Sequence, residues 1–177
     1  MNTLPPSFFA RPTLQVCKEL LGAELVRRHR GRISRHVITD VEAYHGFEDQ
    51  ASHARFGRTA RNAVMFGPPG VWYVYLVYGM HAMLNIVTED DGSPAAILIR
   101  GTQEHEGPGR LTRALSIDRT ISGKPAVSGS GLWIEKRTIS VPKTAIRCSP
   151  RIGVDYAGKW AKKPWRFTLP QGIQKVS

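Results

Sequence analysis

The run from residue 71 to residue 88, VWYVYLVYGMHAMLNIVT, constrains the fold more than any other part of the chain. β-Branched and aromatic residues fill positions 71–77 and 81–88, and only Tyr78, Gly79 and Met80 separate the two runs. Such runs favour strands, and strands joined by so short a connection must pair antiparallel. The sequence therefore predicts a tight hairpin with Tyr78 at its tip.

Alternation along the first of these strands gives each face its own side chains: Tyr73, Tyr75 and Val77 on one, and Trp72, Val74, Leu76 and Tyr78 on the other. We interpret Trp72 and Tyr73 as ordinary core residues. Tyr78 differs because a hairpin tip beside glycine is normally exposed. An exposed aromatic side chain near basic clusters suits insertion into a stack of nucleic-acid bases.

Outside the hairpin, the pattern predicts helices over 14–21 and 108–117 and strands over 23–28, 33–44 and 95–102. Short strands are expected around Trp133, Ile152 and Phe167, an irregular loop over 46–69, and a surface loop over 118–130. With 17 glycines and 12 prolines among 177 residues, turns are favoured over long helices. No linker or repeat divides the chain. We therefore expect residues 1–177 to form one α+β domain dominated by antiparallel strands.

The formal net charge of +11 needs a reason. One basic cluster lies in a segment with no acid between Leu25 and Thr39: Arg27, Arg28, Arg30, Arg32 and Arg35. The segment 136–175 is also basic and contains a single acid, Asp155. A solvated face is the simpler interpretation, but two such regions without local neutralisation favour a polyanion, with nucleic acid the leading candidate. Charge alone does not distinguish DNA from RNA or anionic lipid.

Several classes of protein are excluded by what the sequence does not contain. No apolar run reaches the roughly 18 residues that span a bilayer, and the N-terminus does not resemble a signal peptide. Cys17 and Cys148 show no metal-ligand spacing, and Cys17 is expected to be a small core residue. We expect an intracellular protein without a structural zinc site.

Four polar residues lie at the end of the strand 33–44 and in the loop after it: Glu42, Tyr44, Asp49 and His53. They could form a metal site, an acid/base pair or a solvated turn, and a solvated turn is favoured. Glu42 is the exception. Alternation places it with Ile38 and Asp40 on one face, and a carboxylate presented by a strand end into a pocket is a credible general base.

Three segments carry a resemblance to a known family: EAYHGFEDQASHARFGRTARNAVMFGPPGVWYVYLVYGMHAMLNIVT (42–88), ILIR (97–100) and GPGRLTRALSI (107–117). In these segments the chain resembles the alkyladenine (3-methyladenine) DNA glycosylases. The resemblance implies an α+β fold with a curved antiparallel sheet flanked by helices, like the C-terminal domain of methionyl-tRNA formyltransferase. It also implies a monomer that uses no metal and no cofactor. The continuation Gly101-Thr102-Gln103 departs from the family pattern and leaves the substrate range open.

The resemblance also implies a reaction. The family's catalytic base matches Glu42, and the arginine that helps to hold the attacking water matches Arg100. The reaction would be hydrolysis of the N-glycosidic bond of alkylated or deaminated purines, of the 3-methyladenine, hypoxanthine and ethenoadenine class, leaving an abasic site. We expect a monofunctional enzyme because residues 42–100 contain no lysine that could form a Schiff base with the sugar.

The same resemblance implies how a base rotated out of the duplex would be held. Tyr44 would stack on one side of it, and His53 and Tyr75 on the other. Asn85 would crowd the exocyclic amine of guanine. Tyr78 would fill the gap left in the double-stranded DNA, as the hairpin already suggested.

Four arginines are candidates for contacts with the DNA backbone: Arg55, Arg58, Arg61 and Arg110. Two other functions remain open. A non-catalytic nucleic-acid-binding module would bind without regard to lesions and release no base. A metal-dependent nuclease would use four acidic and imidazole side chains: Asp40, Glu42, Asp49 and His53.

Overall fold

The computed structural model describes residues 2–170. Its strands are β1 (Glu24–His29), β2 (Arg32–His45), β3 (Trp72–Val77), β4 (His81–Val87), β5 (Ala95–Thr102), β6 (Leu132–Glu135), β7 (Arg147–Ser149) and β8 (Arg166–Thr168). Its α-helices are α1 (Pro6–Phe9), α2 (Thr13–Leu20) and α3 (Pro108–Ala114). Its 3-10 helices are η1 (His53–Phe56), η2 (Ala63–Phe66), η3 (Arg119–Ile121), η4 (Ser128–Ser130), η5 (Lys143–Ala145) and η6 (Asp155–Trp160).

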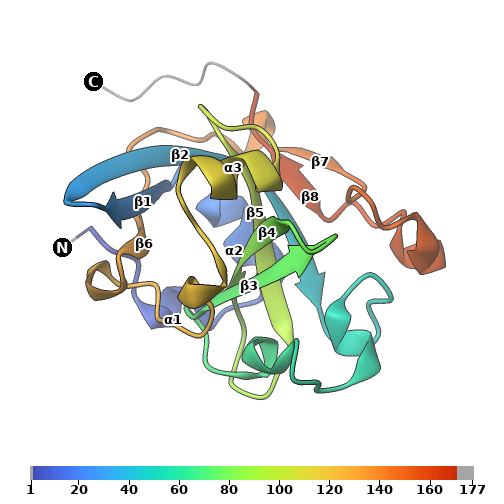
Figure 1. Ribbon diagram of the computed structural model, residues 1–177. Helices are drawn as coiled ribbons and strands as arrows, with labels where there is room; N and C mark the ends of the chain where they lie inside the picture. The colour runs from blue at the N-terminus through green and yellow to red at the C-terminus, as the bar shows by residue number, and fades with distance from the viewer. Residues whose placement is uncertain (1, 171–177) are drawn as a thin grey trace.

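An antiparallel sheet organises the described chain, in the order β3-β4-β5-β2-β1-β6, with β8 paired to β2 and β7 paired to β8. β2 is the central strand, and Figure 1 shows it as a long curved ribbon. Its first half pairs with β1 and its second half with both β5 and β8. The predicted α+β class and antiparallel sheet are confirmed. The formyltransferase-like fold and the single domain over 1–177 stay predictions.

The hairpin predicted from residues 71–88 is confirmed as β3 and β4, which pair from Trp72↔Ile86 to Val77↔His81. Tyr78 and Gly79 reverse the chain with φ angles of 52° and 70°, and the Tyr78 side chain is 89% exposed. Trp72 packs in the main core, whereas Tyr73 packs on the opposite face against loop residues. Both are buried, as expected. The hairpin therefore has one core face, one loop-covered face and a free aromatic tip.

The predicted alternation along β2 is wrong at Ile38. Ile38 packs in the main core with Val41 and Ala43, so it does not share a face with Glu42. The register with β5 shifts on both sides of Asp40, and the consecutive residues Thr39 and Asp40 line one cavity. Such an irregularity inserts an extra residue into one strand, so the side chains that follow point to the opposite face from the one that simple alternation predicts. The simple period of two therefore does not hold through this strand.

Helices α2 and α3 contribute to the same core. α2 contacts β2 and β5, and α3 contacts β4 and β5. Cys17 on α2 is fully buried, as expected. Gly22 follows α2 with φ +87°, and a Cβ atom there would lie 2.6 Å from Cγ2 of Val141. Helix α2 therefore ends at a position where only glycine fits. Helix α1 was not among the predicted elements.

Three predictions about the loops need correction. The segment 118–130 is not simply a surface loop, because Ile121 and Ala126 are buried in the core. The loop 46–69 contains η1 and η2. Ile152 lies in a bend instead of a strand, and the strand before it is β7. Within residues 2–170, no helix is long and apolar enough to cross a membrane.

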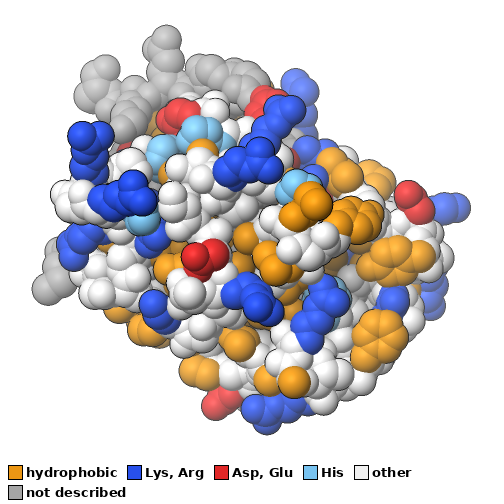
Figure 2. All heavy atoms as spheres, in the orientation of Figure 1, with side chains coloured by type: hydrophobic (Ala, Val, Ile, Leu, Met, Phe, Trp, Pro, Cys, Tyr) orange, Lys and Arg blue, Asp and Glu red, His pale blue; other side chains and the backbone are white. Residues whose placement is uncertain are grey.

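The basic clusters are less free than their sequence suggests. Arg35 pairs across the sheet with Glu135 on β6, at 3.0 Å between Nε and Oε2. In the basic segment 136–175, Arg151 and Arg166 are also paired with acids. Lys175, at the end of that segment, lies outside the described residues. Figure 2 still shows many more basic than acidic side chains on the visible face, with hydrophobic side chains gathered on its right.

Candidate active site

Five strands bring one row of side chains together across the sheet. The row runs from Tyr73 on β3 through Asn85, Leu98 and Glu42 to Arg166 on β8. Cross-strand partners point to the same face, and so do residues two positions along each strand. The row is therefore extended on this face by three more predicted site residues: Tyr44, Tyr75 and Arg100.

Glu42 is fully buried at the centre of this row. Its Oε2 accepts a hydrogen bond from the Tyr44 hydroxyl at 2.7 Å, and its Oε1 accepts one from the backbone N–H of Ile152 at 2.8 Å. The Nη1 atom of Arg100 lies 3.3 Å from Oε1. Burial and the nearby Glu42 raise the pKa of Tyr44 well above its ordinary value, so its hydroxyl stays a donor. These groups hold a carboxylate in one orientation, where it can take a proton or face a developing cation.

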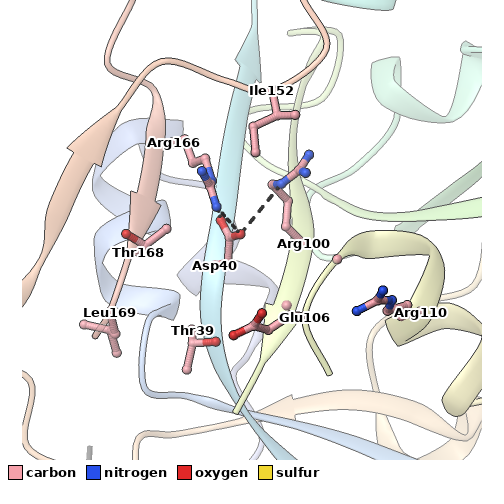
Figure 3. A pocket seen from close by; sticks show the side chains of 11 residues that line it. Thr39, Asp40, Arg100, Glu106, Arg110, Ile152, Arg166, Thr168 and Leu169 are labelled. Carbon is pink, nitrogen blue, oxygen red and sulfur yellow. Dashed lines mark hydrogen bonds and ion pairs between the residues drawn. The ribbon is translucent and has the colours of Figure 1, made fainter. Parts of the chain in front are cut away.

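A second carboxylate, Asp40, lies between Arg166 and Arg100 (Figure 3). Arg166 binds it through two hydrogen bonds, of 3.0 and 2.9 Å. The Nε atom of Arg100 is 3.7 Å from Asp40 Oδ2 and is buried without a hydrogen-bond partner among the described residues. A cavity of about 460 Å³ borders all three side chains. Arg100 is therefore held between two carboxylates.

The predicted stacking residues meet beside Glu42. Tyr44, His53, Tyr75 and Asn85 line a small cavity of about 20 Å³, enough for about one water molecule. The ring centroids of His53 and Tyr75 are 4.5 Å apart. A groove of about 690 Å³ continues from the first three of these residues past Leu98 and Arg100 to the hairpin tip. A base-sized ligand would have to enter through this groove.

His53 owes its position to the loop 46–69. Ser52 accepts a hydrogen bond from the N–H of Ala54 and so begins η1 at His53. The buried Asn62 side chain donates to the carbonyls of His53 and Gly57, at 2.9 and 2.8 Å. Burial, followed by the charges of Arg61 and Arg55, lowers the pKa of His53 to about 4. The ring is therefore neutral at pH 7.

Asn85 is almost completely buried on β4. Its side-chain amide nitrogen donates to the carbonyls of Tyr73 and Met83, both at 3.2 Å. Two backbone acceptors thus fix the plane of this amide at the end of the cavity. Such a group can discriminate between ligands by shape and by hydrogen bonding.

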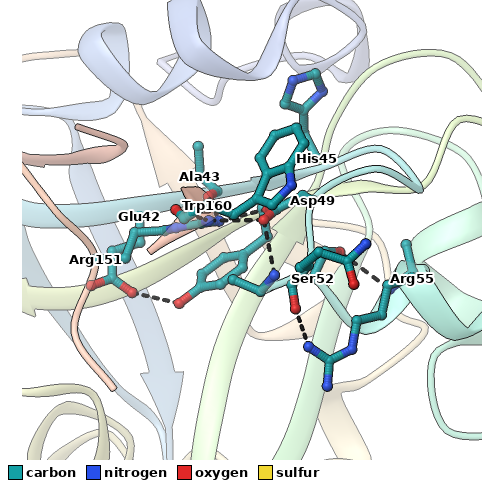
Figure 4. Close-up of polar contacts among 12 residues, drawn as sticks. Glu42, Ala43, His45, Asp49, Ser52, Arg55, Arg151 and Trp160 are labelled. Carbon is teal, nitrogen blue, oxygen red and sulfur yellow. Dashed lines mark hydrogen bonds and ion pairs between the residues drawn. The ribbon is translucent and has the colours of Figure 1, made fainter. Parts of the chain in front are cut away.

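Asp49 corrects the interpretation of its loop as a solvated turn. It is fully buried and forms a two-pronged ion pair with Arg151, at 2.6 and 2.8 Å (Figure 4). Within residues 2–170, no group of three or more His, Cys, Asp or Glu side chains is placed to hold a metal ion. Asp40 and Asp49 face arginines instead.

Among the predicted DNA contacts, Arg110 lines the cavity beside Asp40, and two others line the groove. Tyr78 and Arg61 line it, and Arg61 also donates to the carbonyl of Leu76. Arg58 and Arg110 are exposed. Arg55 differs, since its guanidinium stacks on the exposed rings of Phe56 and Tyr156, at 4.4 and 4.9 Å from their centroids.

Sequence reasoning missed the contribution of the C-terminal segment. The N–H of Ile152, the guanidinium of Arg151 and the guanidinium of Arg166 all complete the site from residues more than a hundred positions away from their partners. Nothing local in the sequence marks them.

Comparisons with known proteins identify the family of the chain. A relative from Methanocella arvoryzae is 45% identical over 188 aligned residues, covering 94% of this chain and 92% of the relative. One from Anaeromyxobacter dehalogenans is 46% identical, covering 94% and 83%, and one from Legionella pneumophila is 42% identical, covering 96% and 95%. Each carries the name "Putative 3-methyladenine DNA glycosylase". The model of the family Methylpurine-DNA glycosylase (MPG) matches residues 7–107 and 102–172. The chain therefore belongs to the methylpurine-DNA glycosylase family.

Proposed function

We propose that this protein removes alkylated or deaminated purines from double-stranded DNA by hydrolysing the N-glycosidic bond. One observation carries the proposal. The carboxylate of Glu42 is buried, held by two hydrogen-bond donors and the Arg100 guanidinium, beside an aromatic cavity that opens into a groove. The family name supports the same class of reaction, a hydrolase acting on N-glycosyl bonds of DNA.

The damaged nucleotide must first rotate out of the duplex. This costs roughly a few kcal/mol, least for a poorly paired lesion. Tyr78, 89% exposed at the hairpin tip, occupies the vacated place in the stack. The base then enters the groove and stacks between Tyr44 on one side and His53 with Tyr75 on the other. Stacking contributes about 1–3 kcal/mol per base with little regard to base identity, which suits a broad range of lesions.

Hydrolysis follows in one displacement. Glu42 takes a proton from water, the water oxygen bonds to C1′ of the sugar, and the base leaves with the electron pair of the broken C–N bond. Arg100, 3.3 Å from Glu42, helps to orient the water, and the carboxylate charge stabilises the oxocarbenium-like sugar. Because residues 42–100 contain no lysine, no Schiff base forms and the DNA backbone is not cut.

Selectivity comes from the end of the cavity. The fixed amide of Asn85 crowds the exocyclic amine of guanine, so lesions of the 3-methyladenine, hypoxanthine and ethenoadenine class are accepted more readily. Arg58, Arg61 and Arg110 hold the distorted backbone. The enzyme acts as a monomer on DNA inside the cell, without a metal or cofactor.

The decisive experiment is single-turnover incubation in EDTA with a duplex carrying one hypoxanthine, followed by alkali cleavage at abasic sites. Wild type releases the base. Glu42→Gln slows release by about 10²- to 10⁴-fold, the usual contribution of a general base, while it still binds the duplex. The matched control is Glu48→Gln, an exposed acid in the adjoining loop, which keeps the wild-type rate.

Three outcomes contradict the proposal or part of it. Release that is equal in Glu42→Gln and wild type removes Glu42 from the chemistry. Lesion-blind binding without release from hypoxanthine, ethenoadenine or methylated duplexes identifies a DNA-binding protein instead. Strand cleavage without alkali shows that the enzyme is not monofunctional.

A further inference from the structure

We infer that the buried Asp49–Arg151 pair positions both the catalytic carboxylate and the stacking residues, so that these two residues are positioning residues of the reaction. The inference rests on the proposed function of the same site. Neither residue touches the groove. Their effect passes through three neighbouring segments: the end of β2, the start of η1 and the bend at Ile152 (Figure 4).

The pair is built as a rigid junction. Both side chains are fully buried, and the two guanidinium nitrogens of Arg151 each donate to one carboxylate oxygen of Asp49. The same nitrogens donate further to the carbonyls of Ala43 and Trp160, at 2.8 and 3.2 Å. Because the guanidinium fork is planar, these partners together fix its orientation. Arg151 is thus tied to the strand position directly after Glu42.

The first consequence concerns Glu42. Ile152 follows Arg151 directly, and its backbone N–H donates to Glu42 Oε1 at 2.8 Å. Ile152 lies in a bend and is 50% exposed, so its side chain has little packing that could keep that N–H in place. The anchored arginine next to it supplies the constraint. The pair therefore places one of the donors that orient the catalytic carboxylate.

The second consequence concerns the two stacking sides. The Arg151 guanidinium lies 4.7 Å from the centroid of the Tyr44 ring and backs that ring. Asp49 also accepts the N–H of Ala51 at 3.0 Å, and its carbonyl accepts the N–H of Ser52, which caps η1 at His53. The pair thereby contacts Tyr44 directly and supports His53 through the cap of η1, and both of these residues line the cavity.

A buried ion pair is a costly way to join segments, since apolar residues of similar volume often give equal stability. Apolar residues cannot replace the planar guanidinium, which donates hydrogen bonds to a defined set of backbone and side-chain acceptors. Preorganised supporting contacts of this kind hold reacting groups in productive geometry. The pair therefore serves the geometry of the site more than the cohesion of the core.

The test combines a structural and a kinetic measurement on Asp49→Asn in the full chain. Amide hydrogen exchange of Ile152 is expected to become at least about tenfold faster, since its N–H loses its fixed acceptor geometry. Single-turnover release of hypoxanthine at saturating enzyme is expected to fall about 100-fold, the effect of misplacing a reacting group by about 1 Å. Affinity for a duplex with an abasic-site analogue changes far less.

The control for stability is Leu132→Ala, a fully buried core substitution on the outermost strand β6. It lowers the melting temperature but leaves the rate of release and the Ile152 exchange near wild type. If Asp49→Asn does not fold, Arg151→Lys takes its place, because lysine keeps the charge beside Asp49 but loses the fork. The same slower release and faster exchange are expected of it.

Three results overturn the inference. One is a wild-type rate in folded Asp49→Asn or Arg151→Lys, whatever the exchange shows. Another is a loss of rate no larger than that of Leu132→Ala at equal melting temperature. If wild type itself releases no base, the proposed function has failed, and unchanged Ile152 exchange then overturns the positioning inference separately.

Discussion

The two walls of the groove are built in different ways. The first wall, residues 42–88, is one continuous stretch containing the end of β2, the loop with η1 and η2, and the hairpin β3–β4. The second wall, residues 150–169, reaches the same place from the far end of the chain. The first wall presents aromatic rings and the tip residue to the groove. The second lines part of the groove between Ile152 and Tyr156 and also contributes an N–H and two arginines that hold acids of the first. Support for the first wall therefore comes from a distant segment.

The largest effect that tests this division is expected in the second wall. Arg151→Met leaves the buried Asp49 without its charged partner and should lower the free energy of unfolding by about 3–5 kcal/mol, measured by urea denaturation. Arg147→Met, an exposed arginine on β7, should change it by no more than about 0.5 kcal/mol.

The double variant Asp49→Leu/Arg151→Met sharpens the same comparison. An apolar pair removes the unpartnered charge and should regain most of the lost stability. Base release should stay slow, because the N–H of Ile152 and the ring of Tyr44 lose their anchor. A double variant that regains stability and full activity together would mean that the second wall supports the fold alone.

The opposite behaviour is expected at the tip of the first wall. Tyr78→Ala removes an exposed ring and should leave the melting temperature unchanged, since the side chain packs against nothing in the free protein. Loss of its stacking should weaken flipping by about 10- to 100-fold, corresponding to about 1–3 kcal/mol, measured by 2-aminopurine fluorescence at the flipped position. Tyr78→Phe keeps the ring and should flip normally. Unchanged flipping in Tyr78→Ala would remove the wedge from the mechanism.

The same division explains what the sequence could predict. The hairpin and β5 follow from residues adjacent in the chain, and β5 occupies the expected positions, 95–102. The faces that carry Tyr75 and Asn85 follow from the period of two along a regular strand. The same period assigned Ile38 to the wrong face, because the irregularity at Asp40 cannot be detected in the hydrophobic pattern of the sequence.

Asp49 could not be interpreted from its own loop for a different reason. An acid among polar residues is normally solvated, and its burial here depends on Arg151, 102 positions later. Likewise, an arginine in a basic tail normally contacts solvent or a polyanion, yet Arg166 binds Asp40. Pairing between such distant residues is decided by the sheet order, with β8 beside β2, which no local pattern contains.

The smallest effect concerns protonation on the first wall, where the pKa values of two histidines are shifted in opposite directions. His53, buried among aromatic rings near Arg61 and Arg55, has a pKa lowered to about 4. His45, on β2 against Trp165 of the second wall, has a raised pKa because it hydrogen-bonds Glu89. An NMR titration of the histidine rings should therefore show His53 titrating near 4 and His45 above its ordinary value.

These shifts act on stability in opposite directions. Between about pH 6.5 and 4 the unfolded chain binds a proton at this position and folded His53 does not, so stability falls as the pH falls through this window. His53→Gln should remove that part of the loss. The contribution of His45 is complete below its unfolded pKa and disappears as the pH rises through its raised value. A His53 that titrates near 6.5 would mean that water reaches the ring freely and that burial does not set its protonation state.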